Sequence, residues 1–166
     1  DQYHSPWNIE AHYWSTGKEL YEDTDGGKFD AFVGGTGTGG TVSGVGRWFK
    51  EHAPNVKIIG ADPLGSVHYH LFHTGTLPTA HVYMVEGIGE DIECRAMDFS
   101  VVDDMRQVND RDSFITARRL VKEEGLFCGG SSGSNVHVAL EIAKELGPGK
   151  IVITVLPDHG NRYVSK

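Results

Sequence analysis

Cysteine is nearly absent from this sequence of 166 residues, which has only Cys94 and Cys128. Two thiols without metal-ligand spacing argue against a zinc module and against a small fold held by disulfides. We therefore expect a reducing, cytoplasmic compartment. Cys128 stands in an apolar run ahead of a glycine-rich segment, so we expect it to be a small buried hydrophobe and not a nucleophile.

Long apolar runs and an excess of basic charge are also missing. No stretch approaches the roughly 20 apolar residues that span a bilayer, and the N-terminal residues do not form a signal peptide, so no membrane association is expected. The formal net charge of −8 disfavours nucleic acid as a partner, because binding phosphates requires a basic face. The chain begins at Asp1 without a methionine, and we expect it to be a piece of a longer polypeptide.

Glycine, in contrast, is abundant, and its 22 residues cluster in a few short runs. One run separates an apolar segment over 29–33 from apolar residues at helical spacing up to His52, and a second apolar segment follows over 56–61. The order strand, glycine loop, helix, strand is one βαβ unit, which predicts neighbouring parallel strands with a right-handed crossover.

Turn residues and changes in hydrophobic spacing divide the rest of the chain in the same way. We expect a helix pair over 8–22 interrupted at Gly17, and an irregular surface segment over 64–81. We also expect a helix over 113–124, which begins near Asn109 or Asp110 and ends before Gly125. A glycine-rich loop over 129–134, a helix after it and a strand over 151–156 complete the expected elements. The pattern predicts an α/β fold with a mostly parallel open sheet and helices on both faces. Ligands bind such sheets at the carboxyl ends of the strands.

The first glycine run, residues 34–41, contains only glycine and threonine. Glycines let backbone N–H groups converge on one point, and the helix that follows adds its positive end, so the run predicts a site for a phosphate monoester. A tight turn without a ligand is the alternative, and a nicotinamide dinucleotide domain is another. The spacing of Gly35, Gly37 and Gly40 matches the dinucleotide fingerprint, with Asp62 as its acidic residue, but no P-loop lysine follows.

Several motifs resemble those of one enzyme family, in the same order along the chain. They are Asp1-Gln2-Tyr3 with Asn8, Ala11-His12-Tyr13 and Thr16-Gly17, then Gly37-Thr38-Gly39-Gly40-Thr41, Val85-Glu86-Gly87-Ile88-Gly89-Glu90-Asp91, Gly129-Gly130-Ser131-Ser132-Gly133-Ser134, and Leu156-Pro157-Asp158 with Arg162-Tyr163. The sequence is similar to the fold type II enzymes that depend on pyridoxal 5'-phosphate (PLP), the group of cysteine synthase and cystathionine β-synthase. The resemblance implies the large domain of the tryptophan synthase β-like fold. Residues 1–166 would form one partial domain, the second half of a β-replacement catalytic core.

The resemblance also implies roles for particular residues. Those that hold the cofactor phosphate would be Gly37, Thr38, Gly39, Gly40 and Thr41. Those near the pyridine ring would be Ser131, at its nitrogen, and Asp158, near its edge. Those on the substrate side would be Gly87 and Gly89, which bring backbone close to the amino-acid portion, and Glu86 and Glu90, which orient the incoming amine or thiol. A neutral hydroxyl at the ring nitrogen makes the cofactor a weaker electron sink, which suits β-elimination.

A lysine that bonds covalently to the cofactor is missing. The family carries it in the first half of the core, and none of the lysines here stands in a comparable motif: Lys18, Lys28, Lys50, Lys57, Lys122, Lys144, Lys150 and Lys166. We expect the segment to bind PLP but not to turn over by itself. The complete homodimeric enzyme would join serine, or an activated serine, to a thiol such as homocysteine. The alternatives are cysteine synthase, with O-acetylserine and sulfide, and a non-catalytic PLP- or phosphate-binding module. The dinucleotide alternative has no place for residues 129–134.

Histidines gather in the irregular segment, at positions 68, 70, 73 and 81. They invite a metal hypothesis, but no cysteine or carboxylate completes a ligand set with them. We expect solvated loop histidines and no metal site.

Overall fold

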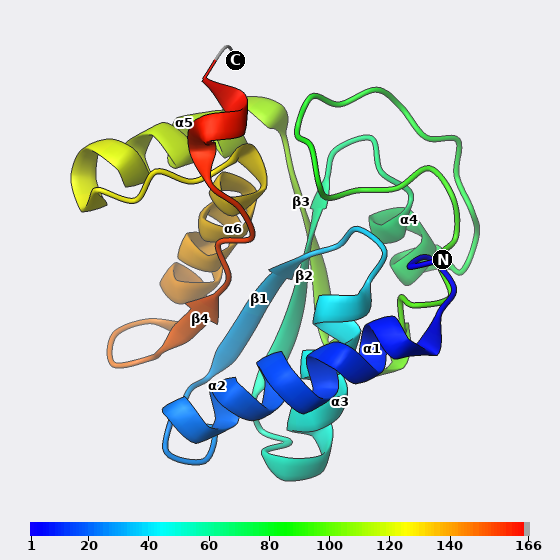
Figure 1. Ribbon diagram of the computed structural model, residues 1–166, viewed down its shortest axis with the longest axis vertical. Helices are drawn as coiled ribbons and strands as arrows, with labels where there is room; N and C mark the ends of the chain where they lie inside the picture. Colours follow the sequence, from blue (N-terminus) through cyan, green and yellow to red (C-terminus); the bar gives the residue numbers. More distant parts are fainter. Residues whose placement is uncertain (165–166) are drawn as a thin grey trace.

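A parallel sheet of four strands, in the order β3-β2-β1-β4, forms the centre of the structure (Figure 1). The structure is a computed structural model, and it describes residues 1–164. The strands are β1 (Ala31–Gly35), β2 (Lys57–Pro63), β3 (Asp104–Val108) and β4 (Val152–Thr154). All three pairings are parallel, which confirms the predicted fold class.

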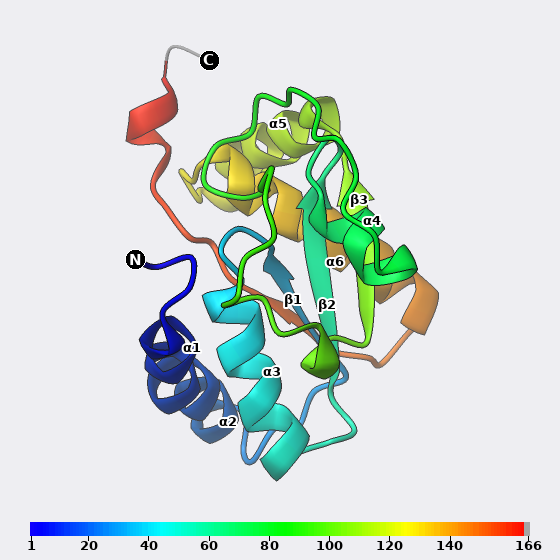
Figure 2. The same ribbon diagram turned by 90° about the vertical axis from the view of Figure 1, so that its right-hand side faces the viewer.

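Helices cover both faces of this sheet (Figure 2). Successive residues of a strand point to opposite faces, so the apolar side chains of one strand contribute to a core on each side. Phe32 of β1 belongs to one apolar cluster with residues of α3 (Gly40–His52). Ala31 and Val33 belong to a second cluster with residues of α6 (Gly130–Leu146). The central strand is therefore buried on both sides, as its continuous apolar sequence predicts.

The two faces are covered by different parts of the chain. The crossover from β1 to β2 runs through α3. After β3 the chain passes through α5 (Asp110–Arg119), the π-helical turn η3 (Leu120–Glu124) and α6, and then enters β4 on the other side of β1. The chain thus leaves β1 toward β2 on one side and returns to β4 on the other side of β1. The position between β1 and β4 is therefore the switch point of the sheet, where ligands bind open α/β sheets. The remaining helical elements are α1 (Pro6–His12), η1 (Tyr13–Gly17), α2 (Lys18–Asp23), α4 (His68–Thr74), η2 (Phe99–Val101) and η4 (Gly160–Tyr163).

The start of α5 follows the predicted signals. The Asn109 side chain accepts a hydrogen bond from the Asp112 N–H at 2.9 Å, as an N-cap residue does. At the other end, Gly125 adopts a φ of 72° directly after η3. The predicted boundaries of this helix are confirmed.

Gly17 does not interrupt the N-terminal helices as predicted. The backbone there stays helical and passes from α1 to α2 through the π-helical turn η1. A Cβ at Gly17 would lie 2.8 Å from the Cβ of Trp48 in α3. The glycine is therefore required for the close approach of two helices and not for a break.

Two other sequence predictions need correction. Residues 68–74 form helix α4 within the segment predicted to be irregular, and His68 is fully buried there, not solvated. The predicted loop over 129–134 is mostly the start of α6, which begins at Gly130. Strand β3 was not anticipated from the sequence. Among the described residues, no helix has the length and apolarity needed to cross a bilayer.

Candidate functional site

The phosphate loop, residues 37–41, connects the end of β1 to the start of α3. Gly39 is the N-cap of α3 with a φ of 94°, and no side chain caps the first N–H groups of this 13-residue helix. Uncapped N–H groups and the helix dipole both favour an anion at this position. The local geometry therefore suits an anion at this helix start.

Packing explains part of the glycine content of this loop. A Cβ at Gly39 would lie 2.4 Å from the Cα of Met97, and one at Gly40 would lie 1.9 Å from Asn8 Oδ1. A Cβ at Gly37 would meet no atom closer than the Gly87 carbonyl oxygen, at 3.3 Å. Gly39 and Gly40 are thus needed for contacts within the protein, whereas the sequence argument attributed the whole run to a ligand.

The threonines of the phosphate loop are held by partners from the N-terminal helices. Asn8 Nδ2 donates to Thr38 Oγ1 at 3.0 Å. His12 Nε2 lies 3.2 Å from Thr41 Oγ1, and His12 Nδ1 lies 2.9 Å from Thr16 Oγ1. These contacts fix both hydroxyl oxygens at the start of α3. Sequence reasoning missed these roles of Asn8, His12 and Thr16, although all three stand in the segment that resembles the family.

His12 sets the direction of this chain of hydrogen bonds. Burial lowers the pKa of its ring, so His12 is neutral at neutral pH, with one donor and one acceptor nitrogen. If Thr16 donates to Nδ1, then the Nε2–H donates to Thr41 Oγ1 and leaves the Thr41 proton for an anion. This order satisfies every group in the series of hydrogen bonds and leaves a hydroxyl donor free at the start of α3, where an anion would bind.

Replacement of His12 by phenylalanine is expected to weaken the binding of inorganic phosphate by about tenfold, because Thr41 loses the donor that orients it. Thr16→Val is the matched control: it removes the far hydrogen bond but keeps His12 beside Thr41, so its loss should be smaller. Calorimetric titration with phosphate measures both. Equal affinity of the His12 variant and the unmodified chain would show that the ring only packs.

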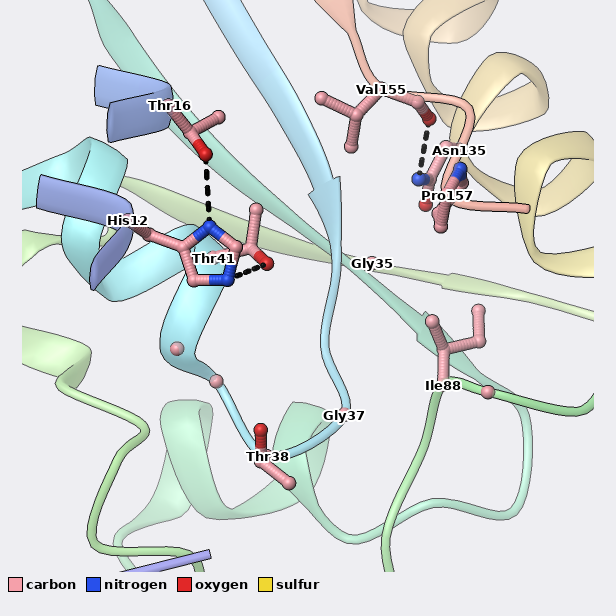
Figure 3. A pocket seen from close by; sticks show the side chains of 13 residues that line it. His12, Thr16, Gly35, Gly37, Thr38, Thr41, Ile88, Asn135, Val155 and Pro157 are labelled. Atoms are coloured by element: carbon pink, nitrogen blue, oxygen red, sulfur yellow. Dashed lines mark hydrogen bonds between the residues drawn. The ribbon is translucent and has the colours of Figure 1, made fainter. Parts of the chain in front are cut away.

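A cavity of about 390 Å³, called here the first cavity, opens between the ends of β1 and β4 (Figure 3). Its wall on one side is the phosphate loop with His12 and Thr16, and on the other side Asn135 of α6 with Val155 and Pro157. This is the switch point of the sheet. The cavity thus lies between the phosphate loop and a wall formed by α6 and the segment that follows β4.

The segment of residues 85–90 lies against the phosphate loop. Gly87 and Gly89 have φ values of 85° and 81°, and the Gly89 N–H donates to the Thr36 carbonyl at 2.7 Å. The Glu90 N–H donates to Ser66 Oγ at 3.0 Å. These bonds attach the segment to the ends of β1 and β2.

A second cavity, of about 380 Å³, adjoins the first at Gly37 and Gly87. It is lined by all four residues assigned to the substrate side, namely Glu86, Gly87, Gly89 and Glu90. It shares Gly37, Thr38, Gly87 and Ile88 with the first cavity. Burial, and then the neighbouring Asp91, raises the pKa of the Glu90 carboxyl. The structure therefore brings these four residues together beside the phosphate loop.

The two residues assigned to the pyridine ring, Ser131 and Asp158, differ in their distance from the cavities. Ser131 is buried in the first turn of α6, and its Oγ is 4.0 Å from where a Cβ would stand at Gly87, which lines both cavities. Asp158 lines neither cavity: its Oδ2 accepts from the Tyr163 hydroxyl at 2.5 Å, and its backbone carbonyl accepts from the Gly129 N–H. Asp158 thus lies beside the N-terminus of α6, with Ser131 nearer to the cavities.

Asp62, the acidic residue of the dinucleotide fingerprint, is also away from both cavities. It is fully buried, where it accepts from the Thr36 hydroxyl at 2.8 Å and from the Tyr69 N–H at 2.9 Å. Burial raises the pKa of this carboxyl to about 6. A carboxyl enclosed in this way does not reach a ribose, so the fingerprint loses its acidic residue.

Residues 1–164 contain no group of three or more His, Cys, Asp or Glu side chains placed to hold a metal ion. None of the lysines in this range lines either cavity. Lys166 lies outside the described residues.

Comparison with known proteins gives matches over nearly the whole chain. The family model described as pyridoxal-phosphate dependent enzyme matches residues 1–158. The cystathionine beta-synthase of Mus musculus is 46% identical over 168 residues, which cover 100% of this chain and 29% of that protein. That of Dictyostelium discoideum is 44% identical, with 100% and 33% covered. The cysteine synthase of Staphylococcus aureus is 38% identical, with 99% and 51% covered. The chain thus spans between 29% and 51% of the length of these relatives.

Proposed function

Because the chain belongs to the family of pyridoxal-phosphate-dependent enzymes, we propose that it is the phosphate-binding part of a β-replacement enzyme. The reaction would exchange the β-substituent of serine, or of an activated serine, for a thiol. In its most specific form the enzyme is a cystathionine β-synthase, which joins serine to homocysteine and releases water. The observation that carries the proposal is the phosphate loop at the uncapped start of α3, facing a cavity at the switch point of the sheet.

The residues present fit the cofactor. The N–H groups of residues 37–41 and the hydroxyls of Thr38 and Thr41 would hold its phosphate. Ser131, in the first turn of α6, would present its hydroxyl to the ring. When bound, PLP supplies an electron sink for the amino-acid substrate.

The second cavity would admit the substrates. Gly87 and Gly89 have no side chain, so the backbone can approach the amino-acid portion closely. Glu86 and Glu90 would orient the incoming amine or thiol. The raised pKa of the Glu90 carboxyl makes its oxygen a better acceptor for the thiol proton.

The covalent lysine would come from another part of the native polypeptide, since no described lysine lines the cavities. The 166 residues alone are then expected to bind the cofactor without turnover. The intact mass of the native polypeptide tests this. A mass well above 18.1 kDa supports a separate lysine-bearing part, whereas a mass of 18.1 kDa favours a non-catalytic PLP-binding module.

Cysteine synthase is the second candidate, since the Staphylococcus aureus protein of that name is 38% identical. It would use O-acetylserine and sulfide. Parallel assays of the native polypeptide with serine plus homocysteine, and with O-acetylserine plus sulfide, distinguish the two. Faster turnover of the first pair supports the cystathionine β-synthase proposal, and faster turnover of the second overturns it.

The purified chain is expected to bind PLP in competition with inorganic phosphate, because both ligands need the phosphate loop. Absorbance titration measures this binding. Thr41→Val should weaken PLP binding by about tenfold through the loss of one hydrogen bond to a charged group. Thr76→Val, at an exposed threonine outside both cavities, should leave it unchanged. PLP binding that phosphate does not reduce would contradict the assignment of this loop.

A homodimer and a cytoplasmic location complete the proposal. Trp7 and Trp14, in α1 and η1, are 77% and 63% exposed, which favours a face that another chain covers. Cys94 and Cys128 are both free and buried, which suits a reducing compartment. Light scattering of the native polypeptide tests the dimer.

A further inference from the structure

One carboxylate holds the start of residues 84–90, called here the substrate-side segment. The N–H groups of Met84 and Val85 donate to the same oxygen of Asp110, Oδ1, at 2.8 and 3.0 Å. Asp110 is the first residue of α5, and Figure 2 shows the loop that contains this segment passing beside that helix. Hydrogen bonds to a charged acceptor are roughly twice as strong as those between neutral groups. Asp110 is therefore a strong attachment for residues far from it in sequence.

The other end of the substrate-side segment is attached to the sheet, through the N–H groups of Gly89 and Glu90 described above. Between the two attachments lie Glu86 and Gly87, both of which line the second cavity. Because Glu86 directly follows Val85, the hydrogen bonds to Asp110 decide where the backbone enters that cavity. The geometry of the second cavity thus depends on α5 as well as on the strands.

Helix α5 is itself fixed to the start of α6. Ser134 Oγ donates to Ser113 Oγ at 2.8 Å, and both residues are fully buried. A Cβ at Gly133 would lie 2.0 Å from the Ser113 carbonyl oxygen, so the two helices touch at this position. Ser113 comes three residues after Asp110, about one helical turn. The first turn of α5 therefore joins the substrate-side segment to α6, which forms one wall of the first cavity.

We propose that Asp110 is a positioning residue of the β-replacement reaction. It fixes the start of the substrate-side segment relative to α6 and so places Glu86 and Gly87 in the second cavity. This inference rests on the proposed function, since it takes the second cavity as the place of the substrates. Asp110 lines neither cavity, so it acts through the backbone of Met84 and Val85 and not by contact with a substrate.

The phosphate loop does not depend on this attachment. Its threonines are held by Asn8 and His12 of α1, on the opposite side of the loop from α5. Loss of the Asp110 carboxylate should therefore disturb the second cavity and leave PLP affinity unchanged. This separation distinguishes the positioning of one segment from a general loss of structure.

The experiment compares Asp110→Ala, Asp110→Asn and Asp112→Ala with the unmodified protein, all as the native polypeptide. Asp112 is the matched control because it is also a carboxylate in the first turn of α5, so both alanine variants lose the same charge at the helix start. Its Oδ2 accepts from Asn109 Nδ2 at 2.8 Å, within the same turn. Asp110→Asn keeps an oxygen that can accept from both N–H groups, and it tests for rescue.

Three quantities are measured. Hydrogen exchange of the Met84 and Val85 amides, without substrates, should be about tenfold faster in Asp110→Ala, while the amides of β1 keep their rates. The kcat/KM for serine plus homocysteine should fall about tenfold in Asp110→Ala and stay within about threefold in the other two variants. PLP affinity, from absorbance titration, should be the same in all four proteins.

Equal exchange at Met84 and Val85 in Asp110→Ala and Asp112→Ala overturns the proposal, and so does unchanged turnover of Asp110→Ala. Faster exchange along β1 as well would show a general loss of stability, which also contradicts it. If the unmodified native polypeptide converts neither substrate pair, the proposed function itself fails. The exchange rates would still show whether Asp110 holds the segment, so the two failures can be told apart.

Discussion

Gly39→Ala is expected to lower the free energy of unfolding by about 4 kcal/mol and to abolish phosphate binding. The φ of 94° disfavours any residue with a Cβ, which costs about 1–2 kcal/mol. The added Cβ would also stand 2.4 Å from the Cα of Met97, a backbone atom that no rotamer change can move, and such overpacking costs about 1–3 kcal/mol more. The loop must shift to relieve this contact, and with it the N–H groups that face the anion.

Gly75→Ala separates the two contributions. Gly75 also has a positive φ, of 69°, but no atom lies within 4 Å of the position of its Cβ. Its substitution should cost only about 1–2 kcal/mol and leave phosphate affinity unchanged. Urea denaturation of both variants measures the difference. Equal losses for Gly39 and Gly75 would mean that Met97 does not constrain the loop.

His68→Leu is expected to raise the free energy of unfolding by about 2 kcal/mol at pH 7. His68 is fully buried, and neither of its ring nitrogens has a hydrogen-bond partner in the described chain. Unsatisfied buried polar groups cost about 1–3 kcal/mol each, and leucine of similar volume has none. The gain is measured by urea denaturation, with His70→Leu on the exposed side of the same helix as the control: it removes only an exposed hydrogen bond to Thr76 and should not raise the stability.

The stabilisation by His68→Leu should grow as the pH falls. Burial lowers the pKa of His68 to about 4, whereas in the unfolded chain it is about 6.5. Between these values the unfolded state binds the proton, so His68 makes the protein less stable as the pH falls from 6.5 toward 4. At pH 5 the variant should gain about 2 kcal/mol beyond its gain at pH 7.

Asp62 opposes this trend and must be considered with it. Its pKa is raised to about 6, so the folded state binds the proton between that value and the ordinary 3.8, and stability rises as the pH falls. The two effects partly cancel each other in the unmodified chain between pH 6 and 4, so the pH dependence due to His68 is measured as the difference between the variant and the unmodified chain. A stability gain of His68→Leu that is the same at pH 7 and pH 5 would contradict the burial of a neutral ring.

The βαβ unit around the phosphate loop could be predicted because its signals are local. Apolar residues are continuous over 31–33, glycines follow at once from Gly34, and helical spacing begins after them. Strand β3 escaped prediction because only Met105 and Val108 of its five residues are buried, a pattern too sparse to mark a strand. Helix α4 escaped for a related reason: it is seven residues long, and three of them are histidine.

The phosphate loop and the substrate-side residues could be placed from motifs, but the residues that orient them could not. The contact of His12 with Thr41 joins positions far apart in sequence. The burial of Asn135, whose oxygen has no partner among residues 1–164, is a property of packing, since a buried asparagine and an exposed one look alike in a sequence. Likewise, the need for glycine at position 39 arises from Met97, which no local pattern connects to it.

The position of β4 has a consequence for how the chain is made. Thr154 Oγ1 donates to the carbonyl of Val33, 121 residues earlier, and β4 is the strand that completes β1 on that side. During synthesis from the N-terminus, one row of backbone groups of β1 therefore stays unpaired until β4 has emerged from the ribosome. Closing so long a separation is slow, and an open strand edge invites pairing with other chains. The nascent chain would be most vulnerable to aggregation in that interval, and the first cavity could form only at its end.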